Sequence, residues 1–402
     1  MTKPVRIICW LMGGGALALL YWWVLVPGIH TASLAEVRAH VAPELLQPLP
    51  HPDGGAERYE ALRTALEPLV KRRPADPEVA LKYQPVFRLD DPEVQQAMDV
   101  MNSGSLDRTG IAFEQQAPVH TLVAGLVAVA MQEAEEGHWP ALVQQMDAAW
   151  LVLDRQAECD ASIDDRTSTL SMQARLKRAS LQLAQRPDLP IAVAEHLAML
   201  NARNINDPGS IRRVLAGEMQ YEQLKWIPDY WAKASGGERW VPSGTYDPLE
   251  TAGLFSDMYL EAIRNAALPV SLWSHDALKD RPPAFPLSWE PEKNALQGAI
   301  RAAWMRIRMN TTANSLGRQT AAVVPVDYVL MRRVLQARTT QDQVAAALAV
   351  SRFRHAFGRD PGNFEELVTA GYLPALPRNH VKDEPREFDL QKLFEWPSRN
   401  AF

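Results

Sequence analysis

The sequence predicts an all-α protein with an N-terminal transmembrane helix. Three observations favour this fold class: an uncharged apolar run near the N-terminus, later segments with apolar residues three and four positions apart, and a scarcity of strand-like alternation. They predict a membrane anchor followed by an extracytoplasmic body of helical hairpins or a helix bundle, or an α-solenoid. An irregular insertion rich in aromatic residues and proline interrupts this body.

The anchor is expected at residues 7–29, IICWLMGGGALALLYWWVLVPGI, which carry no charge. Roughly 20 apolar residues in a helix cross the hydrocarbon core, so this run is long enough to span a bilayer. Lys3 and Arg6 precede it, and no lysine or arginine follows until Arg38. By the positive-inside rule, residues 1–6 form a cytoplasmic tail and the bulk is periplasmic, with the chain in the inner (plasma) membrane.

A cleaved signal peptide is the alternative to a retained signal anchor. The apolar region of such a peptide usually has about 7–15 residues and precedes a small-residue cleavage site. The segment TASLAE, residues 31–36, offers a weak site of this kind. The longer and more aromatic run in this chain favours a retained anchor.

Composition limits the class of partner. The 402 residues are 47% hydrophobic, which suffices for a substantial core. Lys3 and Arg6 contribute +2 to the formal net charge of −6, so the rest of the chain carries −8. A mildly acidic body with dispersed lysine and arginine binds phosphate backbones poorly, so no nucleic acid is expected as a partner.

Residues 30–92 are predicted to be a proline-rich linker with short helices. The segment LQPLPHPDGG is typical of a linker that holds the body away from the membrane. A short helix is expected after it, in which Pro68 introduces a kink or an early end; if the helix continues, Pro74 stops it. Its apolar stripe consists of Tyr59, Leu62, Leu66 and Leu69.

Residues 93–402 are predicted to form the helical body. Consecutive amphipathic helices are expected over 117–201, where Gly137 and Pro140 predict a tight turn and therefore an antiparallel αα-hairpin. One apolar stripe there consists of Val119, Leu122, Leu126 and Val129. No second copy occurs at the period of about 34 residues that a tetratricopeptide array would show.

The insertion, residues 226–289, contains five tryptophans and seven prolines, with one helix expected near 250–265. A long loop of this kind is usually functional or disordered, and its many aromatic rings argue against disorder. A binding groove is one interpretation. The other, which we favour, is a loop held against the helical body by its rings. A long helix is expected from Glu292 to Gly317.

Residues 339–377 predict a C-terminal helix-turn-helix. Thr340 and Gln343 match a capping box at the start of its first helix, and Gly358 is suited to the left-handed conformation that ends it. The core-facing stripe of this helix consists of Ala346, Val350, Phe353 and Phe357.

A short second helix is expected over residues 364–370. Asn363 is its predicted N-cap, with Glu366 as the capping-box partner. Gly371 is predicted to stop this helix, and Leu373 can pack back on it.

The stretch ALAVSRFRHAFGRDPGNFEELVTAGYLPALP, residues 347–377, resembles a pattern of type II secretion pseudopilins. The same pattern ends many uncharacterised bacterial membrane-anchored all-helical proteins. The chain lacks the prepilin peptidase site and the aspartate-proline-tryptophan-glycine segment of pseudopilins. The resemblance therefore implies membership of the uncharacterised helical group, with a pilus or secretion role as an analogy. The matching residues are Ala347, Leu348, Phe353, Arg354, Gly358, Pro361, Leu367, Tyr372, Leu373, Leu376 and Pro377.

Cysteine usage excludes two kinds of site. Cys9 lies within the apolar run, and Cys159 is the only cysteine of the body. A single thiol in the body can form no intrachain disulfide there, and it cannot supply a Cys₂His₂ or Cys₄ zinc site.

The chain contains none of the compact motifs that carry catalysis or bind a metal. It has no His-Glu-x-x-His, Gly-x-Ser-x-Gly, Ser-x-x-Lys or Walker sequence, and no two histidines lie within four residues. His120, His138 and His355 are expected at or near helix ends, with capping or solvent-facing roles. The carboxylate pairs Asp90–Asp91 and Asp164–Asp165 are expected at turns or helix starts. No catalytic, cofactor-binding or metal-ligating residue is therefore predicted, and no cofactor.

These observations favour a binding or scaffolding component of an envelope complex, with an envelope protein as its partner. Whether the chain is an enzyme stays open. The first alternative is a periplasmic hydrolase that uses His275 and Asp276 of the segment WSHD, inside residues 226–289. The second is a secretion or pilus accessory protein.

Overall fold

The structure is a computed structural model that describes residues 32–71, 87–107, 117–203, 205–229, 246–268 and 330–381, together with 272, 314, 317–318, 384–385 and 393–394. The anchor predicted at residues 7–29 lies outside the described residues. So do much of the insertion and almost all of the helix predicted from Glu292 to Gly317. None of the described helices is both long enough and apolar enough to cross a bilayer.

The described residues are mainly helical, and the all-α class is confirmed for them. A two-residue strand β1 (Arg378–Asn379) pairs antiparallel with β2 (Glu384–Pro385). The helices of the described segments are α2 (Leu34–Ala39), α3 (Pro43–Leu46), α4 (Gly55–Lys71), α6 (Pro92–Asn102), α7 (Ala117–Glu135), α8 (Trp139–Cys159), α9 (Ile163–Ala184), α10 (Ile191–Asn201), α11 (Pro208–Gly217), the π-helical η2 (Glu218–Gln223), α12 (Leu224–Trp226), the 3₁₀ turn η3 (Ile227–Asp229), α14 (Pro248–Ala266), α18 (Arg332–Phe357) and α19 (Phe364–Thr369).

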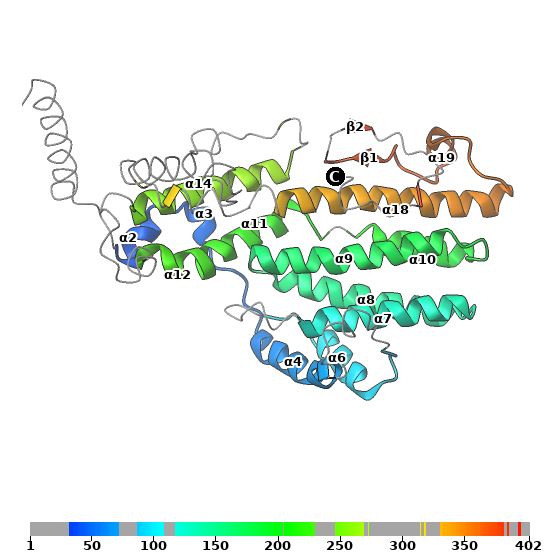
Figure 1. The fold of residues 1–402 in the computed structure, drawn as a ribbon, viewed down its shortest axis with the longest axis horizontal. Helices are drawn as coiled ribbons and strands as arrows, with labels where there is room; N and C mark the ends of the chain where they lie inside the picture. Colours follow the sequence, from blue (N-terminus) through cyan, green and yellow to red (C-terminus); the bar gives the residue numbers. More distant parts are fainter. Residues whose placement is uncertain are drawn as a thin grey trace, which may run out of the picture. The chain divides into compact units, whose positions relative to one another are not determined.

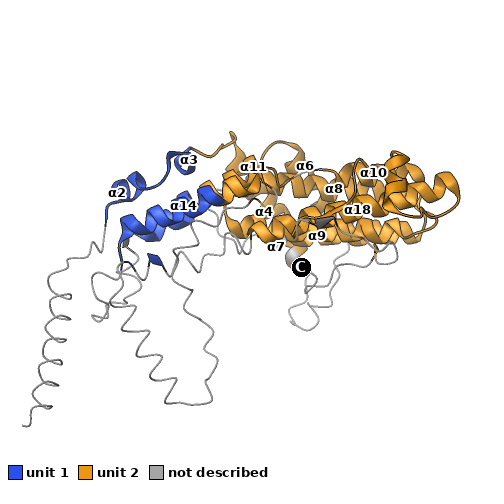
Figure 2. Cartoon of the chain, turned by 90° about the horizontal axis from the view of Figure 1, so that it is seen from above, with its two compact units in different colours: residues 1–47, 218–261, 274–325 blue, residues 48–217, 262–273, 326–402 orange. Residues whose placement is uncertain are grey.

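The chain divides into two compact units, which Figure 2 colours separately. Unit 1 comprises residues 1–47, 218–261 and 274–325. Unit 2 comprises residues 48–217, 262–273 and 326–402, and it contains the long helices α7, α8, α9, α10 and α18, which lie lengthwise beside one another (Figure 1).

The predicted αα-hairpin is confirmed as α7 and α8, which pack along their length. Gly137 turns the chain between them with φ of 77°, and a proline follows in the first turn of α8. All four residues of the predicted stripe on α7 are buried, and Trp150 of α8 is completely buried. Burial of an indole contributes a large share of core stability, so this hairpin anchors unit 2.

Of the two outcomes predicted for Pro68, a kink or an early end of the helix, the early end is wrong, because α4 continues to Lys71. Pro68 stands one turn from the C-terminus of α4, where a missing N–H removes only one helical hydrogen bond. The predicted stripe is confirmed: Tyr59, Leu62, Leu66 and Leu69 are all at most 2% exposed, and α4 packs on α6 and α7. This burial outweighs the one lost bond.

Six buried polar side chains lie on the neighbouring helices α9 and α18, and we call this set the polar stripe. Lys177 of α9 donates from Nζ to the carbonyl of Ala337 on α18 at 2.6 Å. Ser180 accepts a hydrogen bond from Asn201 at 2.8 Å, and the α18 residue Gln343 donates to the carbonyl of Leu393 at 2.7 Å. The polar stripe consists of Thr169, Gln173, Lys177, Ser180, Thr339 and Gln343.

The capping box predicted at Thr340 is wrong, because α18 begins eight residues earlier at Arg332. The Thr340 hydroxyl instead donates to the carbonyl of Gln336, one turn back, at 2.8 Å. Such back-bonding lets threonine occupy a helix interior, so the local pattern of a cap was misleading.

The end of α18 and the helix after it match the predictions, with two exceptions. Gly358 is left-handed with φ of 65°, and Asn363 accepts from the N–H of Glu366 at 2.9 Å as the N-cap of α19. Glu366 reaches the N–H of Gly362 instead of that of Asn363. The predicted core stripe is buried except for Phe357, which is 54% exposed because it lies in the last turn of the helix.

In unit 1, the described rings of the insertion take part in packing. Phe255 lies edge-on to Trp226 and to Tyr259, at centroid distances of 5.7 and 5.9 Å. Tyr246 is fully buried and donates from its hydroxyl to the carbonyl of Ile227 at 2.6 Å. For these rings, the interpretation of a segment held against helices fits better than a groove.

Candidate functional site

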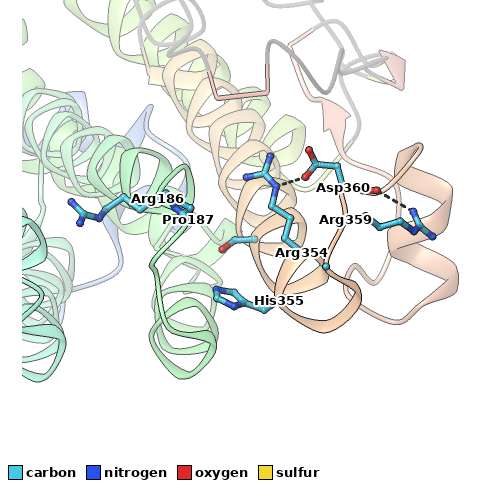
Figure 3. A pocket seen from close by; sticks show the side chains of 8 residues that line it. Arg186, Pro187, Arg354, His355, Arg359 and Asp360 are labelled. Carbon is cyan, nitrogen blue, oxygen red and sulfur yellow. Dashed lines mark hydrogen bonds and ion pairs between the residues drawn. The ribbon is translucent and has the colours of Figure 1, made fainter.

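A pocket of about 330 Å³ opens in unit 2 where α18 ends. Arg354 and His355 come from α18, Asp360 from the following turn, and Arg186 from the turn between α9 and α10 (Figure 3). The full lining is Arg186, Pro187, Ser351, Arg354, His355, Gly358, Arg359 and Asp360. We call it the arginine pocket.

Two contacts determine the shape of the arginine pocket. His355 Nε2 donates to the carbonyl of Leu189 at 2.5 Å, which ties the end of α18 to the turn before α10. The left-handed Gly358 then reverses the chain, so that Asp360 returns to form an ion pair with Arg354 (Figure 3). The fold therefore holds His355 and Arg354 in position before any ligand binds.

Each arginine of the pocket has a carboxylate partner within the chain. Arg186 makes two hydrogen bonds to Asp188, at 3.0 and 2.8 Å, and this pairing raises the pKa of Arg186. Arg359 pairs in the same way with Glu366, whose pKa is lowered, first by this contact. A guanidinium has five N–H donors, so each can pair internally and still donate to a bound anion.

Aromatic and aliphatic surface lies next to the arginine pocket. Phe357 stacks on Phe353 at 4.4 Å between ring centroids, and Tyr372 lies edge-on to both rings. Arg359 lies over the Phe353 ring at 5.2 Å. Leu376, which follows Tyr372 closely in the sequence, is 41% exposed. Arginine and aromatic residues are the types enriched in protein interfaces, whose cores are otherwise depleted in charge.

A second cavity of unit 2, about 370 Å³, lies where residues 49–52, 105–107 and 158–161 meet. His51 Nδ1 lies 2.8 Å from Asp107 Oδ2, although 56 residues separate them in sequence. Cys159 also lines this cavity, but its thiol donates within α8 to the carbonyl of Gln156 at 3.2 Å. The His51–Asp107 pair had no sequence signal, since only the fold brings it together.

The three histidines singled out in the sequence lie near helix ends, but their surroundings differ. His120, in the first turn of α7, contacts the Ser168 hydroxyl of α9, and burial lowers its pKa to about 4 with a smaller effect of Arg175. His138 is the N-cap residue of α8, and His355 lines the arginine pocket. The expectation of a cap or a solvent-facing ring is therefore wrong for His120.

The carboxylate pairs lie at helix starts, as predicted. Asp91 is the N-cap residue of α6, although its carboxylate accepts from the preceding Arg88 N–H at 3.1 Å. Asp165 lies in the first turn of α9 and accepts from Ala161 N–H at 3.2 Å, while its own N–H donates to Ser162. These roles are structural.

His275 and Asp276 lie outside the described residues. No protein-family model matches this chain, and neither a curated protein nor a solved structure matches it. The resemblance of the C-terminal stretch to the pseudopilin pattern therefore stays a prediction.

Proposed function

We propose that the protein is a single-pass inner-membrane protein whose periplasmic helical body binds an envelope protein through the arginine pocket. The partner would present an acidic segment with an apolar side chain beside it. This proposal rests on one observation: a pocket lined by three arginines lies next to an exposed Phe357 in the last turn of α18.

The chemistry of the arginine pocket fits this occupant. Guanidinium groups bind carboxylates in a bidentate geometry, and their planar faces stack on aromatic rings. An aromatic side chain beside such donors provides the apolar contact that most binding hot spots contain. The absence of the compact catalytic motifs from the sequence also favours binding over catalysis.

The first prediction concerns topology. The uncharged residues 7–29, preceded by Lys3 and Arg6, support a retained anchor with the body outside the cytoplasm. Alkaline phosphatase fused after Phe402 is expected to be active in intact cells, and the full-length fusion to stay in the membrane fraction. Two results would contradict the anchor: a mature form that lacks the first three dozen residues, or a reporter fused at the C-terminus that is active only in the cytosol.

The second prediction concerns the partner. Phe357 replaced by the photo-crosslinker p-benzoylphenylalanine is expected to capture one protein from intact cells on irradiation. Adding Arg354→Glu and Arg359→Glu should reduce this crosslink about tenfold, since each reversal sets a carboxylate against the acidic segment. The pairs of Arg354 and Arg359 are exposed, and such pairs contribute little to stability, so the variant should fold.

Two matched controls accompany the crosslinking. Arg63→Glu disrupts an exposed Arg–Glu pair of the same kind on α4 and should leave the crosslink unchanged. The photo-crosslinker at Leu272, another exposed apolar position, should not capture the same protein. Equal capture from Leu272, or a crosslink insensitive to both charge reversals, would refute the arginine pocket as the contact surface.

The alternatives predict other outcomes. A hydrolase in the segment 226–289 predicts that His275→Ala fails to rescue any phenotype of gene loss. A secretion or pilus accessory predicts that deletion of the gene abolishes export of a secreted substrate.

A further inference from the structure

Three metal-ligating side chains meet at the turn between α7 and α8. They line no part of the arginine pocket, although Arg186 of that pocket lies over the ring of Trp139, the residue after His138, at 5.5 Å. His138 Nδ1 lies 3.0 Å from Glu133 Oε2 and 3.3 Å from Glu136 Oε2. One ligand atom from each of the three residues falls within 4.8 Å of the other two. The set combines an imidazole with two carboxylates.

The turn itself creates this arrangement. The N–H of His138 donates to the carbonyl of Glu133 at 2.8 Å, and the N–H of Gly137 donates to the carbonyl of Ala134 at 3.2 Å. With Gly137 left-handed, these two bonds make a Schellman motif, which folds the residue after the glycine back over the last helical turn. His138 is therefore held against Glu133 by backbone bonds, independently of any ligand.

The spacing of the ligand atoms suits a small divalent cation. Zinc binds imidazole nitrogen and carboxylate oxygen at about 2.0–2.2 Å, and tetrahedral geometry then separates ligand atoms by about 3.4 Å. The observed separations from His138 Nδ1 are 3.0 and 3.3 Å. We propose that Glu133, Glu136 and His138 form a Zn²⁺ site, with water as the remaining ligand.

Burial distinguishes this cluster from an ordinary exposed acidic pair. The side chain of Glu133 is only 8% exposed, and it directs Oε2 toward His138 while Arg88 approaches the other oxygen, Oε1, at 3.4 Å. Glu136 and His138 are 45% and 61% exposed, so a cation can reach the site from solvent. Arg88 offsets part of the negative charge but leaves the three ligand atoms in place.

The test measures zinc affinity of the full chain, purified in detergent without a polyhistidine tag and stripped with a chelator. Competition against a fluorescent zinc chelator should show one saturable site. Glu133→Gln and His138→Ala should each weaken binding by about tenfold or more, because each removes one of three protein ligands. His138 is largely exposed, so His138→Ala should fold even if Glu133→Gln does not.

The pair His196–Asp147 supplies the matched controls. His196 Nε2 lies 2.7 Å from Asp147 Oδ1 on the surface of the same unit, with no third ligand among the described metal-ligating groups. His196→Ala and Asp147→Asn should change zinc affinity less than twofold. The proposal is overturned if no saturable site exists, or if His138→Ala binds zinc as tightly as His196→Ala.

Discussion

Replacement of Asp160 by asparagine is expected to lower the free energy of unfolding by about 3–5 kcal/mol, because it leaves a buried guanidinium without its counter-charge. Asp160 Oδ2 lies 3.2 Å from Arg166 Nε, and both side chains are fully buried in unit 2. Urea unfolding followed by circular dichroism measures the effect.

The surroundings of this pair explain why the charge dominates. Arg166 also donates to the carbonyl of Ile205 at 2.8 Å and to the Ser210 hydroxyl at 2.5 Å, so its position is fixed by neutral groups. Asparagine keeps the acceptor that Thr169 uses but removes the negative charge. Burial already lowers the pKa of Arg166, an effect that Asp160 opposes.

Two comparisons isolate the buried charge. Asp188→Asn breaks the exposed pair with Arg186 and should cost less than about 1 kcal/mol. The double variant Asp160→Leu/Arg166→Met should be more stable than Asp160→Asn, since it removes both charges. An exposed ion pair contributes at most about 1 kcal/mol to the free energy of unfolding. If Asp160→Asn lowers this free energy by no more than that, the buried ion pair is not what stabilises this region.

Lys177→Met is expected to stabilise the protein, by on the order of 1–4 kcal/mol at pH 7. Lys177 is completely buried in the polar stripe, and burial lowers its pKa to about 7, with Asp342 opposing the shift. Methionine has a similar length and no charge to desolvate. The carbonyl of Ala337 lies within α18 and keeps its helical hydrogen bond, so the lost contact costs little.

The pH dependence gives this prediction its signature. Between about pH 7 and 10.5 the unfolded chain holds the lysine proton and the folded chain does not, so stability rises with pH in this window. Below about pH 7 the full penalty persists. The advantage of Lys177→Met should therefore shrink from pH 7 to pH 9, whereas Lys225→Met, at an exposed position, should show no such trend. A constant difference across this range would contradict the buried charge.

Local signals in the sequence predicted most helix positions because they act within a few residues. Gly137, Gly358 and Gly371 end helices where their left-handed backbone was expected. Thr340 misled because a cap and a helix interior share the same local sequence, and the difference lies in α9 and α10, which pack on α18. Because α18 is packed against α9 and α10, it stays helical through Thr340, where the local sequence suggested a helix start.

The candidate sites were less accessible to prediction, for a different reason at each. The arginine pocket joins Arg186 to Arg354, which are far apart in sequence, so no spacing rule connects them. The Glu133–Glu136–His138 cluster is local, but a search for paired histidines passes over a histidine with two carboxylates. A Schellman glycine between a glutamate and a histidine was the signal that could have found it.

The polar stripe has a consequence for assembly of the body. A slipped or rotated α18 would break the hydrogen bonds from the His380 N–H to Thr339 and from Gln343 to the carbonyl of Leu393, and each buried polar group left without a partner costs about 1–3 kcal/mol. The polar stripe therefore disfavours other registers of α18, even though its buried polar side chains contribute little to the net free energy of folding. The C-terminal end of α18 is consequently held in one position on unit 2. A partner could bind there without first inducing a conformational change.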